Sequence, residues 1–213
     1  MKFEEWEPVY ERILDDMGYD RSSDESSARL LKALMQMADL IDDDDMYDIL
    51  GKDVAVIGPA DPDLTGLSGR TVIAAGSATE IVMKEIVPDI VVTDLDGDIG
   101  SQIEASAEGA ITFMHAHGDN SDLIMKYCRE FKGPVILTTQ SVPDNVIRNY
   151  GGFTDGDRAV CIARHFGSSS IELRGFDFKR PAVKDGSDPV TKMRKLVWAE
   201  RIIMDGSRDI ILP

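Results

Sequence analysis

Short apolar runs, separated by polar segments of helical composition, dominate the chain after residue 53. Each run is bounded by glycine, proline or polar residues, as is typical of strands that are buried on both faces. Helices are expected between the runs, for example over residues 80–87. Strands that alternate with helices at this spacing predict an α/β fold with a parallel, Rossmann-like wound sheet. The five runs are residues 54–57, 71–75, 90–92, 110–114 and 134–138.

Residues 1–50 follow a different pattern, because their apolar side chains recur at the three- and four-residue spacing of helices. A first helix is expected to end at Gly18, and Ser22 with Glu25 fits a capping box ahead of a second. A further turn is expected to begin in the acidic run 42–45, which would be unfavourable at the end of a helix. The apolar face predicted for the second helix consists of Leu30, Leu34, Met37 and Ile41.

The chain beyond residue 150 is richer in glycine and more strand-like, notably at residues 159–163 and 171–178. A final helix is expected from Asp188 to Met204, and residues 209–212 fit an edge strand. The side chains expected on the inward face of the final helix are Met193, Leu196 and Val197.

The length of 213 residues suffices for one compact domain with an appendage. We therefore expect an N-terminal helical appendage at residues 1–50 and an α/β catalytic domain, with its C-terminal helix, at residues 51–213. The formal net charge of −16 argues against binding to nucleic acid or to an anionic membrane surface, since both partners are polyanions.

No apolar run approaches the roughly 18 residues of a membrane span, and the first residues are acidic. The sequence therefore predicts neither a membrane helix nor a signal peptide, and a cytoplasmic protein is expected. Two cysteines, Cys128 and Cys161, lie among apolar residues and are predicted to be buried rather than nucleophilic.

Three aspartates at alternate positions, Asp94, Asp96 and Asp98, follow the apolar run at residues 90–92. In an open α/β sheet, ligands bind outside the carboxyl ends of the strands. Closely spaced carboxylates repel one another, and a hard divalent cation relieves the repulsion, so the stretch predicts a Mg²⁺ site that also holds substrate phosphates. The alternative is a turn of helix-capping aspartates. A calcium loop is set aside, because residue 105 is alanine where that loop needs glutamate.

A second polar cluster follows the fourth run and contains two of the three histidines of the chain. Histidines at alternate positions of an extended chain point the same way. Zinc would need a further cysteine or histidine nearby, so the imidazoles fit phosphate binding or proton transfer better. Capping of the next helix is the alternative. The cluster is His115, His117, Asp119 and Asn120, and Thr138, Thr139 and Gln140 end the next strand at the same edge.

A third cluster is a glycine-containing loop whose backbone amides and charged side chains can hold a phosphate or the polar atoms of a ring. The three clusters, which end three elements, are expected to converge on one edge of the sheet. The residues of this loop are Gly152, Phe153, Thr154, Asp155, Asp157 and Arg158.

Four segments together resemble the archaeal-type 6-hydroxymethyl-7,8-dihydropterin pyrophosphokinase family, which is itself similar to the catalytic domain of thiamine pyrophosphokinases. They are residues 88–97, 115–120, 138–140 and 152–159, and they occur in order. The resemblance implies ATP- and Mg²⁺-dependent transfer of a diphosphate to the hydroxymethyl group of a reduced pterin, with release of AMP. The product would serve a folate- or methanopterin-type cofactor.

The resemblance also implies roles for single residues. The Mg²⁺ ligands would be Asp94, Asp96 and Asp98, assisted by Asp119. The phosphates would lie against His115, His117, Asp119 and Asn120. Residues 152–158 and Asp177 would lie near the pterin or the nucleotide, and the C-terminal helix would present Lys192 and Lys195.

Two turns depart from the family pattern: Gly58-Pro59 replaces a glycine-rich turn, and Ala75-Gly76-Ser77 replaces an expected Ala-Asp-Gly. Three other interpretations stay open: a thiamine pyrophosphokinase, a nucleotide- or metabolite-sensing protein without turnover, and a metal-dependent phosphohydrolase. A P-loop kinase is excluded, because neither Gly-Lys-Ser nor Gly-Lys-Thr occurs. The sequence is compatible with a homodimer.

Overall fold

The strands of the described chain form one eight-stranded sheet in which every pairing is parallel, so the predicted α/β class is confirmed. The computed structural model describes residues 1–51, 53–180, 188–205 and 209–212. The strand order is β6-β5-β4-β3-β2-β1-β7-β8. The strands are β1 (Asp53–Ile57), β2 (Thr71–Ala75), β3 (Ile90–Thr93), β4 (Ile111–Ala116), β5 (Val135–Thr139), β6 (Ile147–Arg148), β7 (Ser170–Arg174) and β8 (Ile210–Ile211).

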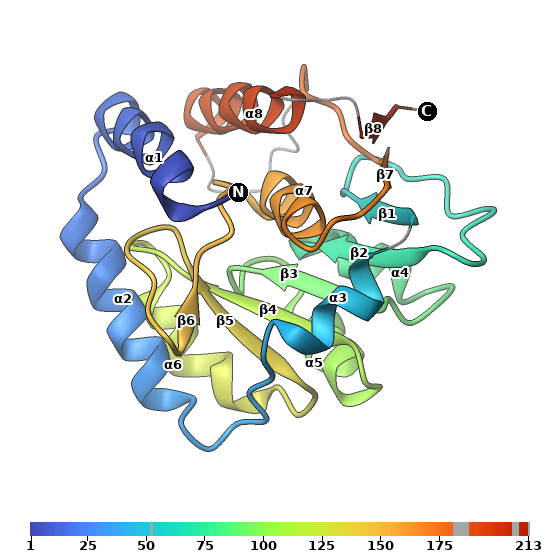
Figure 1. Ribbon diagram of the computed structural model, residues 1–213, viewed down its shortest axis with the longest axis horizontal. Helices are drawn as coiled ribbons and strands as arrows, with labels where there is room; N and C mark the ends of the chain where they lie inside the picture. The colour runs from blue at the N-terminus through green and yellow to red at the C-terminus, as the bar shows by residue number, and fades with distance from the viewer. Residues whose placement is uncertain (52, 181–187, 206–208, 213) are drawn as a thin grey trace.

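Helices cover both faces of this sheet (Figure 1). From β1 to β6 the chain moves stepwise to one edge, and α7 then carries it back across β3, β2 and β1 to β7. In Figure 1, α7 lies between the sheet and α8. The helices are α1 (Phe3–Met17), α2 (Arg21–Leu34), α3 (Asp44–Leu50), α4 (Thr79–Val82), α5 (Ile99–Ala107), α6 (Ser121–Tyr127), α7 (Asp155–His165) and α8 (Pro189–Met204), with short 3-10 turns η1 (Gly76–Ala78) and η2 (Cys128–Glu130).

Successive side chains of the central strands are buried on opposite faces, as the continuous apolar runs predicted. Val54 and Val56 of β1 pack in the cluster that contains α3 and α7, whereas Ala55 and Ile57 pack with α4. Residues 209–212 were expected to add an edge strand, and β8 confirms this by pairing with β7.

The N-terminal helices share the hydrophobic core of the sheet. Trp6 of α1 is fully buried beside α7 and α8, and Leu31 of α2 packs against β4 and β5. Met46 and Leu50 of α3 are buried in the same cluster as β1. The three predicted helical stretches are confirmed, and the domain division at residue 51 stays a prediction.

Two expectations for α2 were wrong. Its N-cap is Asp20, whose carboxylate accepts a hydrogen bond from the Ser22 amide, so the helix starts earlier than the predicted capping box. It also ends at Leu34, which leaves Met37 on the surface at 97% exposure. The other predicted residues do face the core: Leu30 and Leu34 are half-buried against the same cluster as Leu31, and Ile41 packs against the cluster of α3.

The strand-like interpretation of residues 159–163 was also wrong, because these residues lie in α7. All five are buried, since α7 packs against the sheet on one side and α8 on the other. A helix buried on opposite sides loses its amphipathic period and looks like a buried strand in sequence.

Two further helices differ in detail from expectation. The helix expected over residues 80–87 ends at Val82. In α8 the most buried side chains include Trp198 and Ile203, whereas Val197, expected to face inward, is 37% exposed.

Both cysteines are buried, as predicted. Burial raises the pKa of the Cys161 thiol to about 12, so this thiol stays protonated and unreactive at neutral pH. Among the described residues, no helix has both the length and the apolar character needed to cross a membrane.

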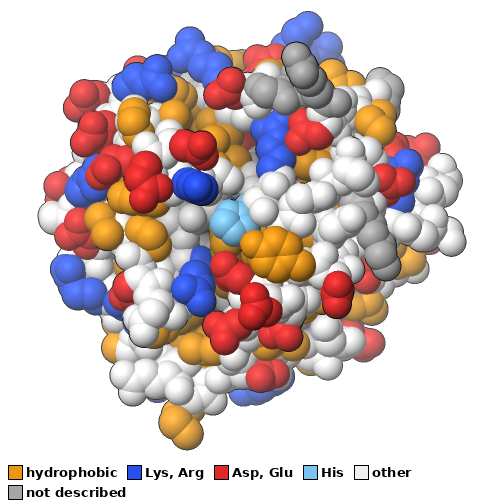
Figure 2. Space-filling view, viewed as in Figure 1, with side chains coloured by type: hydrophobic (Ala, Val, Ile, Leu, Met, Phe, Trp, Pro, Cys, Tyr) orange, Lys and Arg blue, Asp and Glu red, His pale blue; other side chains and the backbone are white. Residues whose placement is uncertain are grey.

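Acidic side chains lie over much of the face shown in Figure 2, with lysines and arginines between them. This distribution agrees with the net charge of −16.

The turn into α7 depends on Gly152, and we predict that Gly152→Ala destabilises the fold strongly. Its φ is +93°, and an added Cβ would lie 2.4 Å from the Arg158 Cα. Gly109→Ala is the matched control, because its φ is +105° but nothing lies within 4 Å of the added Cβ. We expect the control to lose about 1 kcal/mol of unfolding free energy and Gly152→Ala at least about 3 kcal/mol, measured by urea denaturation. Equal losses would contradict the steric explanation.

Candidate active site

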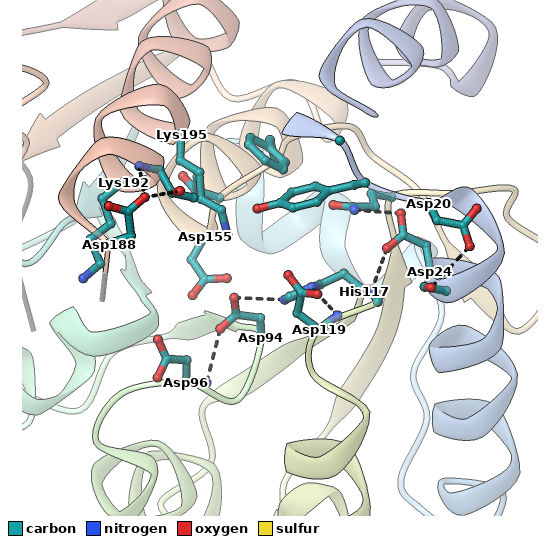
Figure 3. A pocket seen from close by; sticks show the side chains of 18 of the residues that line it. Asp20, Asp24, Asp94, Asp96, His117, Asp119, Asp155, Asp188, Lys192 and Lys195 are labelled. Atoms are coloured by element: carbon teal, nitrogen blue, oxygen red, sulfur yellow. Dashed lines mark hydrogen bonds and ion pairs between the residues drawn. The ribbon is translucent and has the colours of Figure 1, made fainter. Parts of the chain in front are cut away.

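A cavity of 530 Å³ lies at the carboxyl edge of the sheet, where the predicted clusters were expected to meet. Asp94 and Asp96 reach it after β3, His117 and Asp119 after β4, and Gln140 after β5. Figure 3 shows Asp94 and Asp96 on the sheet side, with Asp155 above them. The start of α7 adds Phe153, Thr154 and Asp155, and α8 adds Lys192 and Lys195.

Asp94 and His117 face each other across this edge. The His117 Nε2 lies 3.4 Å from the Asp94 Oδ2, and the two side chains are 17% and 28% exposed. Burial alone would raise the pKa of Asp94, but the hydrogen bond and charge of His117, with Arg158 behind them, hold the pKa below its usual value. Asp94 is therefore an anion that points into the cavity.

Asp155 brings a further carboxylate to the same place from α7. It pairs with the guanidinium of Arg158 at 2.8 Å, and the Arg158 side chain is only 2% exposed. Burial and the charges of Asp94 and Asp96 nevertheless raise the pKa of Asp155 well above its usual value. The carboxylates of β3 and α7 are thus close enough to repel one another.

The turn after β2 makes room for this carboxylate. Gly76 has φ +50°, and a Cβ built there would lie 2.3 Å from the Asp155 Oδ2. Asp155 would therefore have to move if position 76 carried a side chain. The neighbouring Ser77 lines the cavity.

Several predicted site residues lie behind the cavity wall instead of on it. His115 is 1% exposed, and its Nδ1 lies 2.9 Å from the Thr138 Oγ1. Burial, together with the charges of Arg158 and His117, lowers the pKa of His115 well below its usual value, so its ring is neutral. Thr139 is also buried and accepts a hydrogen bond from the Ser141 amide.

Asn120, predicted to contact phosphates, holds the two strand ends together. Its Nδ2 donates to the backbone oxygens of Asp94 and His115, each at 2.8 Å. Its Oδ1 accepts from the His117 amide at 3.0 Å. Asn120 therefore positions the residues that line the cavity.

Capping explains two other predicted residues, Asp98 and Asp157. Asp98 is exposed and caps α5 by accepting from the Ser101 amide, so the helix-capping alternative holds for this aspartate. Asp157 accepts from the amides of Phe153 and Thr154 at 2.6 and 2.8 Å, which fixes the start of α7. Gly152 packs under α7, and Asp177 lines a neighbouring cavity.

The N-terminal helices supply cavity residues that sequence reasoning missed. Asp24 of α2 is 3% exposed and accepts from the Tyr10 hydroxyl, from the Gly118 amide at 2.7 Å and from the Gln140 Nε2 at 2.8 Å. Trp6 Nε1 donates to the Gln140 backbone oxygen at 2.8 Å. Figure 3 shows Asp24 on the side opposite Lys192 and Lys195. The missed lining residues are Gly18, Tyr19, Asp20, Ser23, Asp24, Ser77, Gly118, Asp188 and Thr191.

Burial, with the hydrogen bond and charge of Asp24, raises the pKa of Tyr10, so the phenol is a permanent donor. Tyr10 and Asp24, on the buried faces of the amphipathic helices α1 and α2, were the signal in the sequence. The sequence of these helices does not predict which strand ends they pack against.

The donor set at the carboxyl edge fits Mg²⁺. Asp94, Asp96 and Asp155 offer hard carboxylate oxygens, and their repulsion favours a bound cation. Within the described ranges, no three His, Cys, Asp or Glu side chains form a ready-made metal cage. Mg²⁺ commonly uses one or two carboxylates and takes its other ligands from water and substrate phosphates.

Comparison with known proteins places these features in a family. The family model described as "6-hydroxymethylpterin diphosphokinase MptE-like" matches residues 66–182. This chain belongs to that family. The matched residues include the strand-end clusters and the start of α7, whereas α1, α2 and α8 lie outside them.

Three relatives of the family align over almost the whole chain, and each is named 6-hydroxymethyl-7,8-dihydropterin pyrophosphokinase. The protein from Methanothermobacter thermautotrophicus is 40% identical over 95% of this chain and 94% of its own. That from Pyrococcus furiosus is 39% identical, with 95% and 93% covered. That from Methanocaldococcus jannaschii is 33% identical, with 95% of each covered.

The buried hydrogen bonds of Asp24 generate a stability prediction. Asp24→Ala leaves the Gly118 amide and the Gln140 Nε2 without their acceptor, and we expect a loss of about 3 kcal/mol of unfolding free energy. Asp20→Ala on the same helix is the control, since an exposed N-cap is worth about 1 kcal/mol. Thermal and urea unfolding measure both, and equal costs would show that the buried acceptor does not anchor α2.

Proposed function

We propose that this protein transfers a diphosphate from ATP to the hydroxymethyl group of 6-hydroxymethyl-7,8-dihydropterin and releases AMP. The observation that carries the proposal is the group of carboxylates at the carboxyl edge of the sheet, with two lysines of α8 lining the same cavity. The names of the three relatives favour the pterin as the acceptor. The product would serve a folate- or methanopterin-type cofactor.

Asp94 and Asp96 would hold Mg²⁺, and Asp155 and the predicted ligand Asp119 line the same cavity. When bound, the ion would neutralise phosphate charge and orient the phosphates. Asp98 is not part of the proposed set, because it caps α5.

Lys192 and Lys195 would bind the phosphates from the opposite side. Both line the cavity from α8, and the Lys195 Nζ lies 5.7 Å from the ring centroids of both Tyr19 and Phe153. Phosphoryl-type transfer depends mainly on positioning and on neutralising charge, which lysines on a fixed helix provide.

His117 is the residue we propose to accept the proton of the pterin alcohol. It lines the cavity and contacts Asp94. His115, which the sequence also suggested as a proton acceptor, is buried behind the cavity wall. A carboxylate partner orients an imidazole and stabilises its protonated form.

The first functional test measures AMP formed from ATP and Mg²⁺ with the dihydropterin as acceptor. We expect AMP with the pterin and not with thiamine, and at least about a hundredfold loss in Asp94→Asn, because the metal-binding charge is removed. Asp98→Asn is the matched control: it removes the same charge four residues away, yet asparagine still caps α5. We expect it to retain activity within a few-fold.

Other outcomes would replace the proposal. AMP with thiamine alone would indicate thiamine pyrophosphokinase activity. Nucleotide binding without AMP formation would indicate a sensing protein, and phosphate release without an acceptor would indicate a hydrolase.

A further inference from the structure

A second cavity of 250 Å³ adjoins the first. It is walled by the loops that follow β1 and β7, by the start of α7 and by α8. Its lining is mostly apolar, with Pro59, Phe176, Phe178, Leu196 and Ala199. The residues that line both cavities are Ser77, Thr154, Asp155, Lys192 and Lys195.

We propose that this second cavity binds the adenine ring of ATP, while the pterin lies in the first cavity. The inference rests on the proposed function, because it divides the two substrates of that reaction between the two cavities. The triphosphate would then pass over the shared wall, where Lys192 and Lys195 line both cavities.

The covalent structures of the substrates favour this division. The reacting oxygen of the pterin is separated from its ring by a single methylene, so the ring must lie beside the reacting phosphorus. Asp94 and Asp96, the proposed metal ligands, line only the first cavity. Adenine is separated from the β-phosphorus by the ribose and the α-phosphate, so it can lie across the shared wall.

The polarity of the two cavities favours the same division. The pterin carries an amino group, a ring N–H and a carbonyl on one edge, and buried polar atoms need partners. More polar side chains line the first cavity than the second; they include Asp119, and also Gln140 and Asp20, of which Gln140 donates to Asp24 and Asp20 accepts from Ser22. In the second, the Asp177 carboxylate already accepts from the amides of Lys179 and Arg180 at 2.9 and 3.1 Å.

Two glycines leave room for the Phe176 ring of the second cavity. Phe176 lies against Gly58 and Gly156, where an added Cβ would come within 3.1 and 2.8 Å of its ring. The rings of Phe176 and Phe178 are 5.8 Å apart and inclined at 42°. The Gly58-Pro59 turn, a departure from the family pattern, thus forms part of this aromatic wall.

The test uses two reciprocal variants in the full chain. Phe178→Ala shortens the wall of the second cavity, and Tyr19→Ala shortens that of the first. Loss of a stacking aromatic typically weakens base binding about tenfold. We expect Phe178→Ala to raise the Kd for AMP about tenfold and to leave the Kd for the pterin unchanged, and Tyr19→Ala to do the reverse, by isothermal titration calorimetry.

Leu196→Ala is a second variant of the same cavity, contributed by α8, and it should also weaken AMP binding. Thermal unfolding checks that each variant is folded. Unchanged AMP affinity in both variants of the second cavity, or weaker binding of the pterin instead, would overturn the assignment. Because binding is measured without turnover, a failed AMP-release assay with a confirmed effect on AMP affinity would reject the proposed reaction and retain the nucleotide site.

Discussion

The mutual repulsion of carboxylates at one edge of the sheet is the constraint on which the site depends. Asp94 and Asp96 follow β3 and Asp155 begins α7, and the charges of Asp94 and Asp96, together with burial, raise the pKa of Asp155 well above its usual value. Arg158, which pairs with Asp155, offsets part of the repulsion, and the His117 Nε2 lies 3.4 Å from the Asp94 Oδ2. Like charges stay close together in a folded protein only when the surrounding structure fixes their positions. Such an arrangement costs folding free energy, and it is commonly found at functional sites.

Hydrogen bonds from buried side chains fix the positions of the segments that carry these carboxylates. Asn120 ties the ends of β3 and β4 together, and Asp157 fixes the start of α7. Asp24 joins α2 to Gly118 and Gln140. Residues that looked like ligands in the sequence therefore include several that hold the true cavity wall in place.

The sheet and the convergence of its polar clusters could be predicted because parallel topology alone brings strand ends to one edge. The predictions from the sequence were wrong where a short stretch of residues fits two different structures or roles. The run at residues 159–163 of α7 is short and continuously apolar, so its pattern fits a buried strand as well as a buried helix. Asp98 caps a helix with the residue type that also binds metals. The contribution of Asp24 could not be predicted, because it depends on how α2 docks on distant strands.

The path of α7 explains how the candidate active site combines distant parts of the chain. α7 returns from one edge of the sheet across β3, β2 and β1, so its first residue, Asp155, lies over the carboxyl end of the sheet beside Asp94. α8 packs on α7 and brings Lys192 and Lys195 to the same point. The space that a side chain at position 76 would need is occupied by Asp155. In the turn that lacks the expected aspartate, α7 therefore supplies the carboxylate of Asp155 instead.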